Sequence, residues 1–174
     1  GKSSLLMVLV REWSAADGER ILATTTTKLG AEELYGPWTS FSAADADGIL
    51  SMTTASEGAW LAYSRHDMCR SRLFGFAPEV IDVVAARGNF TRIIVEADGA
   101  RRLPLKAPSE IEPVCPASTD TLIAVAGLGG LGTRLGEDTV FRPERWTALT
   151  GLPPLARVTA ESLARIIVHP EGLM

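Results

Sequence analysis

The chain has 174 residues, with 17 Lys and Arg against 21 Asp and Glu and a formal net charge of −4. This length predicts a single domain over residues 1–174, and the negative charge excludes a general attraction to polyanions, so we expect no nucleic-acid partner. Cys69 and Cys115 lie far apart without C-x-x-C spacing, which argues against a zinc site and favours a reducing cytoplasm. No apolar run approaches the roughly 18 residues of a membrane span, so we expect no membrane partner.

The chain opens with Gly1-Lys2-Ser3-Ser4, and apolar residues at helical spacing follow from Leu5 to Trp13. The opening run matches the second half of the phosphate-binding loop G-x-x-x-x-G-K-[ST], in which backbone amides and the Lys bind phosphates and the hydroxyl binds Mg²⁺. We therefore predict the whole run as nucleotide-binding, Lys2 as catalytic and Ser3 as a metal ligand. The alternative is an ordinary exposed Lys at a helix start. The first half of the loop and its strand do not precede Gly1, which predicts a truncated amino terminus.

A turn at Gly18 and a buried strand over residues 20–25 follow the first helix, as in one unit of an α/β sheet. The strand leads into four consecutive threonines and Lys28. We predict Thr26 and Thr27 in a loop at the carboxyl edge of the sheet, where they would sense γ-phosphate or Mg²⁺. The alternative is that the threonines only reflect the preference of β-branched residues for strands. Lys28 is either a phosphate contact or a solvated loop residue.

Residues 31–54 carry no chemistry that we can assign. Two apolar and aromatic runs, residues 59–63 and 71–76, flank a polar stretch that contains His66 and predict a β-hairpin. His66 stands beside an acidic residue, but neighbours on an exposed loop rarely form a catalytic relay, so we disfavour a catalytic His66. A helix is predicted over residues 79–86, since Pro78 precedes it and Gly88 follows it.

The run from Thr91 to Val95 is β-branched and ends in Glu96-Ala97-Asp98-Gly99. A central parallel strand that ends in acids and a glycine is typical of a Walker B strand, whose carboxylate lies on the metal side. Glu96 has E-x-x-G spacing to Gly99, whereas Asp98 stands at the expected strand end, and alternation places both acids on one side. We predict both acids as catalytic and metal-side residues and Gly99 as nucleotide-binding. The alternative is that Asp98 and Gly99 form only a turn.

The remainder of the chain predicts structure more than chemistry. Three cations within residues 101–108 either neutralise charge beside a phosphate site or belong to an ordinary loop rich in proline. Residues 121–127 predict a third buried strand, followed by a glycine-rich loop rather than a dinucleotide fingerprint. Residues 141–149 and 160–168 predict two helices, the second capped by Thr159.

Several segments together resemble one family. They are Gly1-Lys2-Ser3, Thr24 to Lys28, Val95 to Ala100, Pro104 to Pro108 and His169 to Gly172. The family is that of the selenium-dependent hydroxylase accessory proteins, YqeC-like, a branch of the P-loop nucleotide-binding proteins. The most specific part of the resemblance is Glu96-Ala97-Asp98-Gly99-Ala100 followed by Pro104-Leu105-Lys106.

The resemblance implies a three-layer α/β fold of the P-loop NTPase type, with a mainly parallel sheet that lacks its first strand and with an inserted β-hairpin. It also implies a protein that helps to mature selenium-dependent molybdenum hydroxylases, with Mg²⁺ and ATP or GTP as cofactors. The partner would be such a hydroxylase or a protein that matures its cofactor. Because the chain stops at Met174 before the place of a base-reading motif, we expect truncation there, and ATP and GTP both stay open.

Three hypotheses follow for the function. The first is a slow Mg²⁺-dependent NTPase that couples its nucleotide state to the maturation of a molybdenum enzyme. The second is a scaffold that binds a cofactor or a partner without hydrolysis, and the third is a small-molecule kinase. Loss of nucleotide binding in the Lys2→Ala variant would favour the NTPase. If that variant still co-purifies with a molybdenum enzyme, the scaffold would be favoured. Phosphoryl transfer to an acceptor that is faster than hydrolysis would favour the kinase.

Overall fold

The computed structural model describes residues 1–173. Its contacts group the chain into two compact units, which we describe separately. Residues 2–97 and 114–119 form the first, called here the sheet unit, while residues 98–113 and 120 onward, together with Gly1, form the second, called the tail unit. Over the described residues, no helix has both the length and the apolar character needed to cross a membrane.

The sheet unit is built on four parallel strands in the order β3-β4-β1-β7. Their bounds are Arg20–Thr25 for β1, Thr39–Ser42 for β3, Gly58–Tyr63 for β4 and Arg92–Glu96 for β7. Every residue of β1 is buried, as expected for a strand with a partner on each side and a covered face above and below. The predicted strands at residues 20–25 and 91–95 and the mainly parallel sheet are confirmed.

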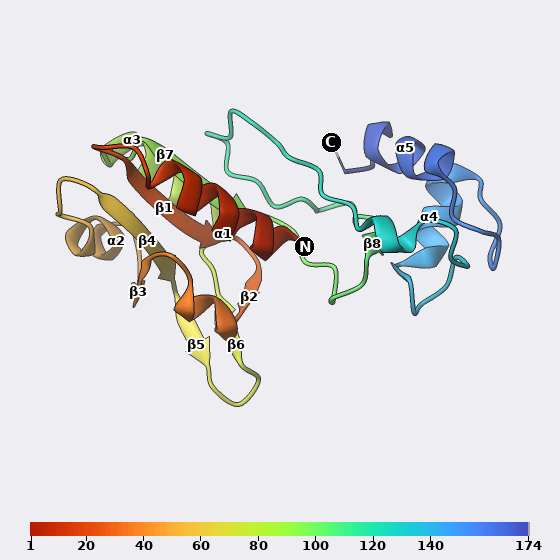
Figure 1. Cartoon of the computed structure of the whole chain (residues 1–174), viewed down its shortest axis with the longest axis horizontal. Helices are drawn as coiled ribbons and strands as arrows, with labels where there is room; N and C mark the ends of the chain where they lie inside the picture. The colour runs from red at the N-terminus through yellow and green to blue at the C-terminus, as the bar shows by residue number, and fades with distance from the viewer. Residues whose placement is uncertain (174) are drawn as a thin grey trace. The chain divides into compact units, whose positions relative to one another are not determined.

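Three helices cover the two faces of this sheet, namely α1 (Lys2–Trp13), α2 (Ala46–Met52) and α3 (Pro78–Arg87). Side chains of β1 alternate between the faces, so Ile21 packs in one cluster and Leu22 in another. Val10 of α1 joins the cluster of Ile21, and Ile81 of α3 joins that of Leu22 together with residues of α2. The sheet therefore lies between α1 on one face and the α2–α3 pair on the other (Figure 1).

A second, antiparallel sheet in this unit has the order β2-β6-β5, with β2 at Lys28–Gly30, β5 at Arg65–Asp67 and β6 at Arg72–Phe74. The predicted hairpin therefore exists, but its first strand was placed wrongly at residues 59–63. Those residues belong to β4, because Leu61 and Ala62 are fully buried in the parallel sheet. A continuous apolar run suits a strand covered on both faces better than an exposed hairpin arm.

The tail unit contains a short parallel pair, β8 (Leu105–Lys106) and β9 (Val140–Phe141), and two helices, α4 (Pro143–Thr150) and α5 (Ala160–Val168). The helices pack Trp146 and Ile166 into one core with Leu105 of β8. At the start of α5 the Thr159 hydroxyl accepts a hydrogen bond from the Ser162 amide at 3.1 Å. Both helix predictions and the Thr159 cap are confirmed.

The predicted strand over residues 121–127 does not form. A strand needs a partner for its backbone amides and carbonyls, and no described strand pairs with this stretch. Leu122 is 38% exposed and Ile123 is 56% exposed, so the apolar run that suggested a buried strand is not buried.

A buried lysine organises the charged groups of the tail unit. The Lys106 side chain is only 3% exposed, and its ammonium binds both Asp98 and, at 2.7 Å, the Glu112 carboxylate. Arg142 donates to the same Glu112 carboxylate at 2.7 Å. Burial alone would raise the pKa of Glu112, but the hydrogen bonds from Arg142 and Lys106 outweigh it and lower the pKa from 4.5 to about 2.

This pairing predicts how the stability of the tail unit depends on pH. Glu112 stabilises the folded state fully above pH 4.5, and this contribution is lost as the pH falls from 4.5 to about 2. Glu112→Gln should be less stable than the natural chain near neutral pH and should lose less stability on acidification. Hydrogen exchange of the α4 amides between about pH 6 and pH 3 measures this change. Glu110→Gln, at an exposed carboxylate nearby, is the control, and an unchanged pH profile in Glu112→Gln would contradict the assignment.

Candidate functional site

The first turn of α1 meets the carboxyl end of β7 at one hydrogen bond. The Ser3 hydroxyl donates to the Glu96 carboxylate over 2.9 Å, and Glu96 is the last residue of β7. The structure thus joins a residue of the predicted phosphate loop to an acid of the predicted Walker B strand. Both lie at the carboxyl edge of a parallel sheet, which is where open α/β sheets bind their ligands.

Lys2 is the first residue of α1 and is half-buried. Within residues 1–173 its ammonium forms no hydrogen bond and no ion pair. Gly1 and Ser4, the other residues of the predicted loop, are exposed on either side of Lys2 and Ser3. The amino end of a helix carries unpaired amides and a partial positive charge, so this turn favours an anion.

The threonine run ties the strand ends of this edge together. Thr24 and Thr25 lie in β1, where the Thr24 hydroxyl donates to the Ala62 carbonyl at 2.9 Å and the Thr25 hydroxyl to the Glu96 carbonyl at 2.6 Å. Thr26 follows the strand, and its amide also donates to the Glu96 carbonyl, at 3.3 Å. The bonds from Thr25 and Thr26 hold Glu96 in place from the side of β1, and that of Thr24 ties β1 to β4.

The hydroxyls of Thr26 and Thr27 are engaged within the protein. Thr26 donates to the Val114 carbonyl at 2.6 Å, and the Thr27 hydroxyl lies 3.1 Å from that of Thr25. Both residues follow β1 at the carboxyl edge, where the sequence placed them. Their role as sensors of phosphate or metal stays a prediction.

Glu33 is a residue of this region that the sequence did not reveal. It lies in the short 3-10 helix Ala31–Tyr35, is 6% exposed, and its Oε2 has no hydrogen-bond partner within the described part of the chain. Burial raises the pKa of Glu33, and the neighbouring Ser3 hydroxyl lowers it in part. Because that hydroxyl has one proton and donates it to Glu96, the Oε2 of Glu33 stays without a donor among the described residues.

The main chain of Glu33 is held firmly although its side chain is not. Its carbonyl accepts a hydrogen bond from the Trp38 indole at 2.8 Å and from the Gly36 amide at 3.2 Å. A 3-10 turn has no extended periodicity, and the burial of one carboxylate arises only from packing with distant segments. No pattern in the sequence therefore distinguishes Glu33 from its exposed neighbour Glu32.

Asp98 and Gly99 belong to the tail unit rather than to the sheet unit. The Lys106 ammonium binds the Asp98 carboxylate and donates to the Gly99 carbonyl at 3.0 Å. Asp98 therefore already has a cation as its partner. Lys28 and His66 are placed by aromatic contacts, Lys28 at 4.8 Å above the Phe74 ring and His66 edge-on to Tyr63.

The strands and helices define an α/β protein with a mainly parallel sheet, and the comparisons place it in a family. The family described as YqeC protein matches residues 1–144, and the chain belongs to this family. The chain is 34% identical over 174 residues to a protein of Escherichia coli (strain K12) called "Uncharacterized protein YqeC". The match covers 99% of this chain and 66% of that protein, so the chain spans just under two thirds of its relative. No solved structure matches the chain.

The unpaired Glu33 carboxylate predicts a stabilising substitution. Glu33→Gln keeps the shape of the side chain and removes a buried charge whose Oε2 has no hydrogen-bond partner in the described chain, so the free energy of unfolding should rise by about 1 kcal/mol near neutral pH without added metal. Urea unfolding followed by circular dichroism measures the change. The control Glu32→Gln, at the exposed neighbour, should stay within about 0.5 kcal/mol of the natural chain. A less stable Glu33→Gln would show that the carboxylate has a partner in the folded protein.

Proposed function

We propose that the first turn of α1 binds the phosphates of ATP or GTP with Mg²⁺, and that the protein is a slow NTPase. We also propose that it assists the maturation of selenium-dependent molybdenum hydroxylases, a role that rests on the family resemblance alone. The observation that carries the nucleotide site is the 2.9 Å hydrogen bond from Ser3 to Glu96. It joins a loop hydroxyl to a strand-end acid, the two groups that hold Mg²⁺ in P-loop NTPases.

The free charge at this turn supports a phosphate ligand. Lys2 has no anionic partner in the described chain, and α1 is 12 residues long, so its dipole is well developed at Ser3. Phosphate groups in proteins are often bound by the backbone amides at the start of a helix, and a nearby ammonium adds to this attraction. In the proposed complex Lys2 contacts the β- and γ-phosphates, while Gly1, Ser3 and Ser4 contribute backbone amides.

The oxygen ligands near Ser3 fit Mg²⁺. Hard cations prefer oxygen, and Mg²⁺ is commonly held by one or two carboxylates while phosphates and waters complete its shell. The Ser3 hydroxyl, Glu96 and the unpaired Glu33 supply such oxygens. Within residues 1–173 no group of three or more His, Cys, Asp or Glu could hold a metal alone, which suits an ion that arrives with its nucleotide. When bound, Mg²⁺ would neutralise charge on the phosphates.

The open edge of β7 supports the proposed P-loop arrangement. β7 pairs with β1 on one side and with no described strand on the other, and its residues Ile93 to Glu96 are only half-buried. In the proposed arrangement the strand that leads into the phosphate loop would pair with this free side of β7. We propose that the complete sheet carries such a strand next to β7.

Several features favour slow turnover. The chain contains no glutamine, so it has none to position an attacking water, and no arginine finger can be assigned. The Thr26 hydroxyl would have to leave the Val114 carbonyl before it could contact a nucleotide. Asp98 could act as a metal-side residue only if its ion pair with Lys106 broke. The existing bonds of Thr26 and Asp98 also favour the second candidate, a scaffold that binds a cofactor or a partner without hydrolysis.

Calorimetric titration of ATP and GTP, with and without Mg²⁺, tests the proposal on the complete gene product. We expect Mg²⁺-dependent binding that weakens at least about tenfold in Lys2→Ala, since the variant loses the lysine ammonium of the turn. Lys28→Ala is the matched control, because that lysine lies over Phe74 and should leave affinity unchanged. Absence of binding, or equal binding by Lys2→Ala, contradicts the nucleotide site. A molybdenum enzyme that co-purifies equally with Lys2→Ala would support the scaffold instead.

A further inference from the structure

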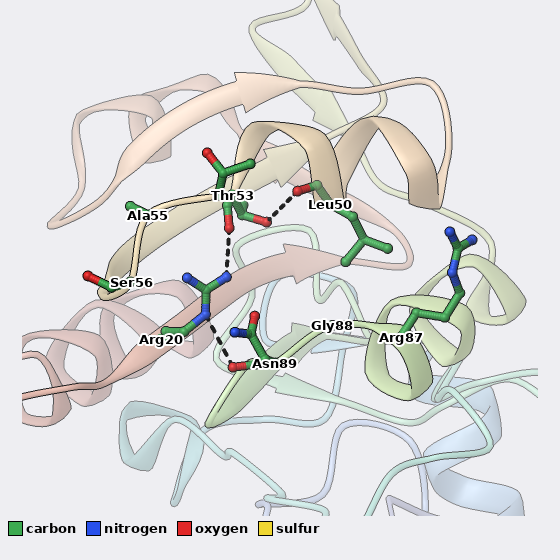
Figure 2. Close-up of a pocket in the computed structure, with 9 residues that line it drawn as sticks. Arg20, Leu50, Thr53, Ala55, Ser56, Arg87, Gly88 and Asn89 are labelled. Atoms are coloured by element: carbon green, nitrogen blue, oxygen red, sulfur yellow. Dashed lines mark hydrogen bonds between the residues drawn. The ribbon is translucent and has the colours of Figure 1, made fainter.

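A pocket opens at the amino edge of the parallel sheet, near the starts of β1, β4 and β7, whereas Glu96 lies at the carboxyl end of β7. Figure 2 shows the residues that line this pocket. Its volume is about 340 Å³, and its wall consists of the first residue of β1, the end of α2 with the turn that precedes β4, and the end of α3 with the turn that precedes β7. All of these segments lie within the sheet unit. The nucleotide site proposed above uses none of them, so the pocket stands apart from it.

Arg20 forms the floor of this pocket and is 7% exposed. Its Nη2 donates to the Thr53 carbonyl at 2.6 Å and its Nε to the Asn89 carbonyl at 3.2 Å, and Figure 2 shows the guanidinium between these two turns. The same guanidinium lies 5.2 Å from the Trp60 ring centroid and 5.4 Å from that of Phe90. Four contacts thus fix its position and plane.

Arg20 has no carboxylate partner within residues 1–173, and its Nη1 makes no hydrogen bond there. The adjacent Glu19 accepts hydrogen bonds from Thr91 and Arg92 instead. A buried charge is costly unless it is paired, and carbonyls and aromatic rings offset only part of that cost. The guanidinium is therefore a fixed cation with unused donor capacity.

The rest of the pocket wall supplies no negative charge. The residues that line it include a second arginine, Arg87, and the polar side chains of Ser56 and Asn89, but no Asp or Glu. Arg87 is exposed, and its charge is balanced at 2.7 Å by Asp47 of α2, so Arg20 at the floor is the cation of the pocket wall without an acidic partner in residues 1–173. Such a wall matches an oxyanion, because arginine donates several hydrogen bonds to carboxylate or phosphate oxygens.

We infer that this pocket binds a small ligand through an oxyanion group, a phosphate or a carboxylate, which contacts the Nη1 of Arg20. The volume admits a metabolite rather than a polymer. A purely structural role for Arg20, in which it only joins the two turns, would explain its hydrogen bonds to Thr53 and Asn89. That role does not explain why, within the described residues, Nη1 makes no hydrogen bond or why the pocket wall contains no Asp or Glu.

Titration of inorganic phosphate, and separately of acetate, into the ¹⁵N-labelled protein tests this inference by nuclear magnetic resonance. We expect saturable shifts of the Ser56 and Asn89 amides with a dissociation constant on the order of 1 mM. A response to phosphate alone identifies a phosphate ligand, and a response to acetate alone a carboxylate ligand. Phosphate bound at the α1 turn would shift Lys2 and Ser3 instead, and Lys2→Ala would remove those shifts only.

Variants of the pocket decide the outcome. Arg20→Met should abolish the shifts at Ser56 and Asn89, whereas Arg65→Ala, at an arginine that lies over Phe74 outside the pocket, should leave them unchanged. If Arg20→Met does not fold, Ser56→Asp still tests the inference, because its carboxylate should occupy the site and weaken phosphate binding at least about tenfold. Ser56→Asn is the matched neutral control and should bind normally. Absence of saturable shifts with either anion, or equal binding by Ser56→Asp, overturns the inference.

Discussion

The pairing of β1 with β7 is the constraint on which the rest of the sheet unit depends, and it ends at Glu96. There the backbone carbonyl of Glu96 accepts the Thr25 hydroxyl and the Thr26 amide, while its carboxylate accepts the Ser3 hydroxyl. One residue thereby joins two strands and the start of α1. The strand register and the placement of the carboxylate are consequently fixed together, so a change in the register would also remove the acid from the first turn of the helix.

The two ends of the same sheet carry opposite unpaired charges. At the carboxyl edge Glu33 is a buried carboxylate without a donor, and at the amino edge Arg20 is a buried guanidinium without an acid. In the tail unit, by contrast, Lys106 is buried to a similar degree and has two carboxylates around it. The tail unit thus satisfies its buried charge internally. A buried charge whose contacts are incomplete costs stability, so Arg20 and Glu33 are the positions where the sheet unit has most to gain from a ligand.

Local patterns predicted much of this fold, and non-local pairing explains what they missed. The strand at residues 91–95 and the helix at residues 160–168 have signals that neighbouring residues supply, and both form. Residues 59–63 and 121–127 carry equally apolar runs, yet one became a central strand and the other no strand at all, because each outcome depends on a partner strand elsewhere in the chain. The site divides in the same way. Ser3 and Glu96 were predicted from motifs, whereas Glu33 became visible only through its burial.

The core of the tail unit also shows that the matched family segment is not a structural boundary. The family match ends at residue 144, inside α4, but Trp146 lies beyond that point and packs with Leu105 and Val140, which lie before it. Leu163 and Ile166 of α5 complete the same cluster. A chain cut at residue 144 would leave Leu105 and Val140 without the side chains that bury them. Residues 145–173 therefore belong to the same folding unit as β8 and β9.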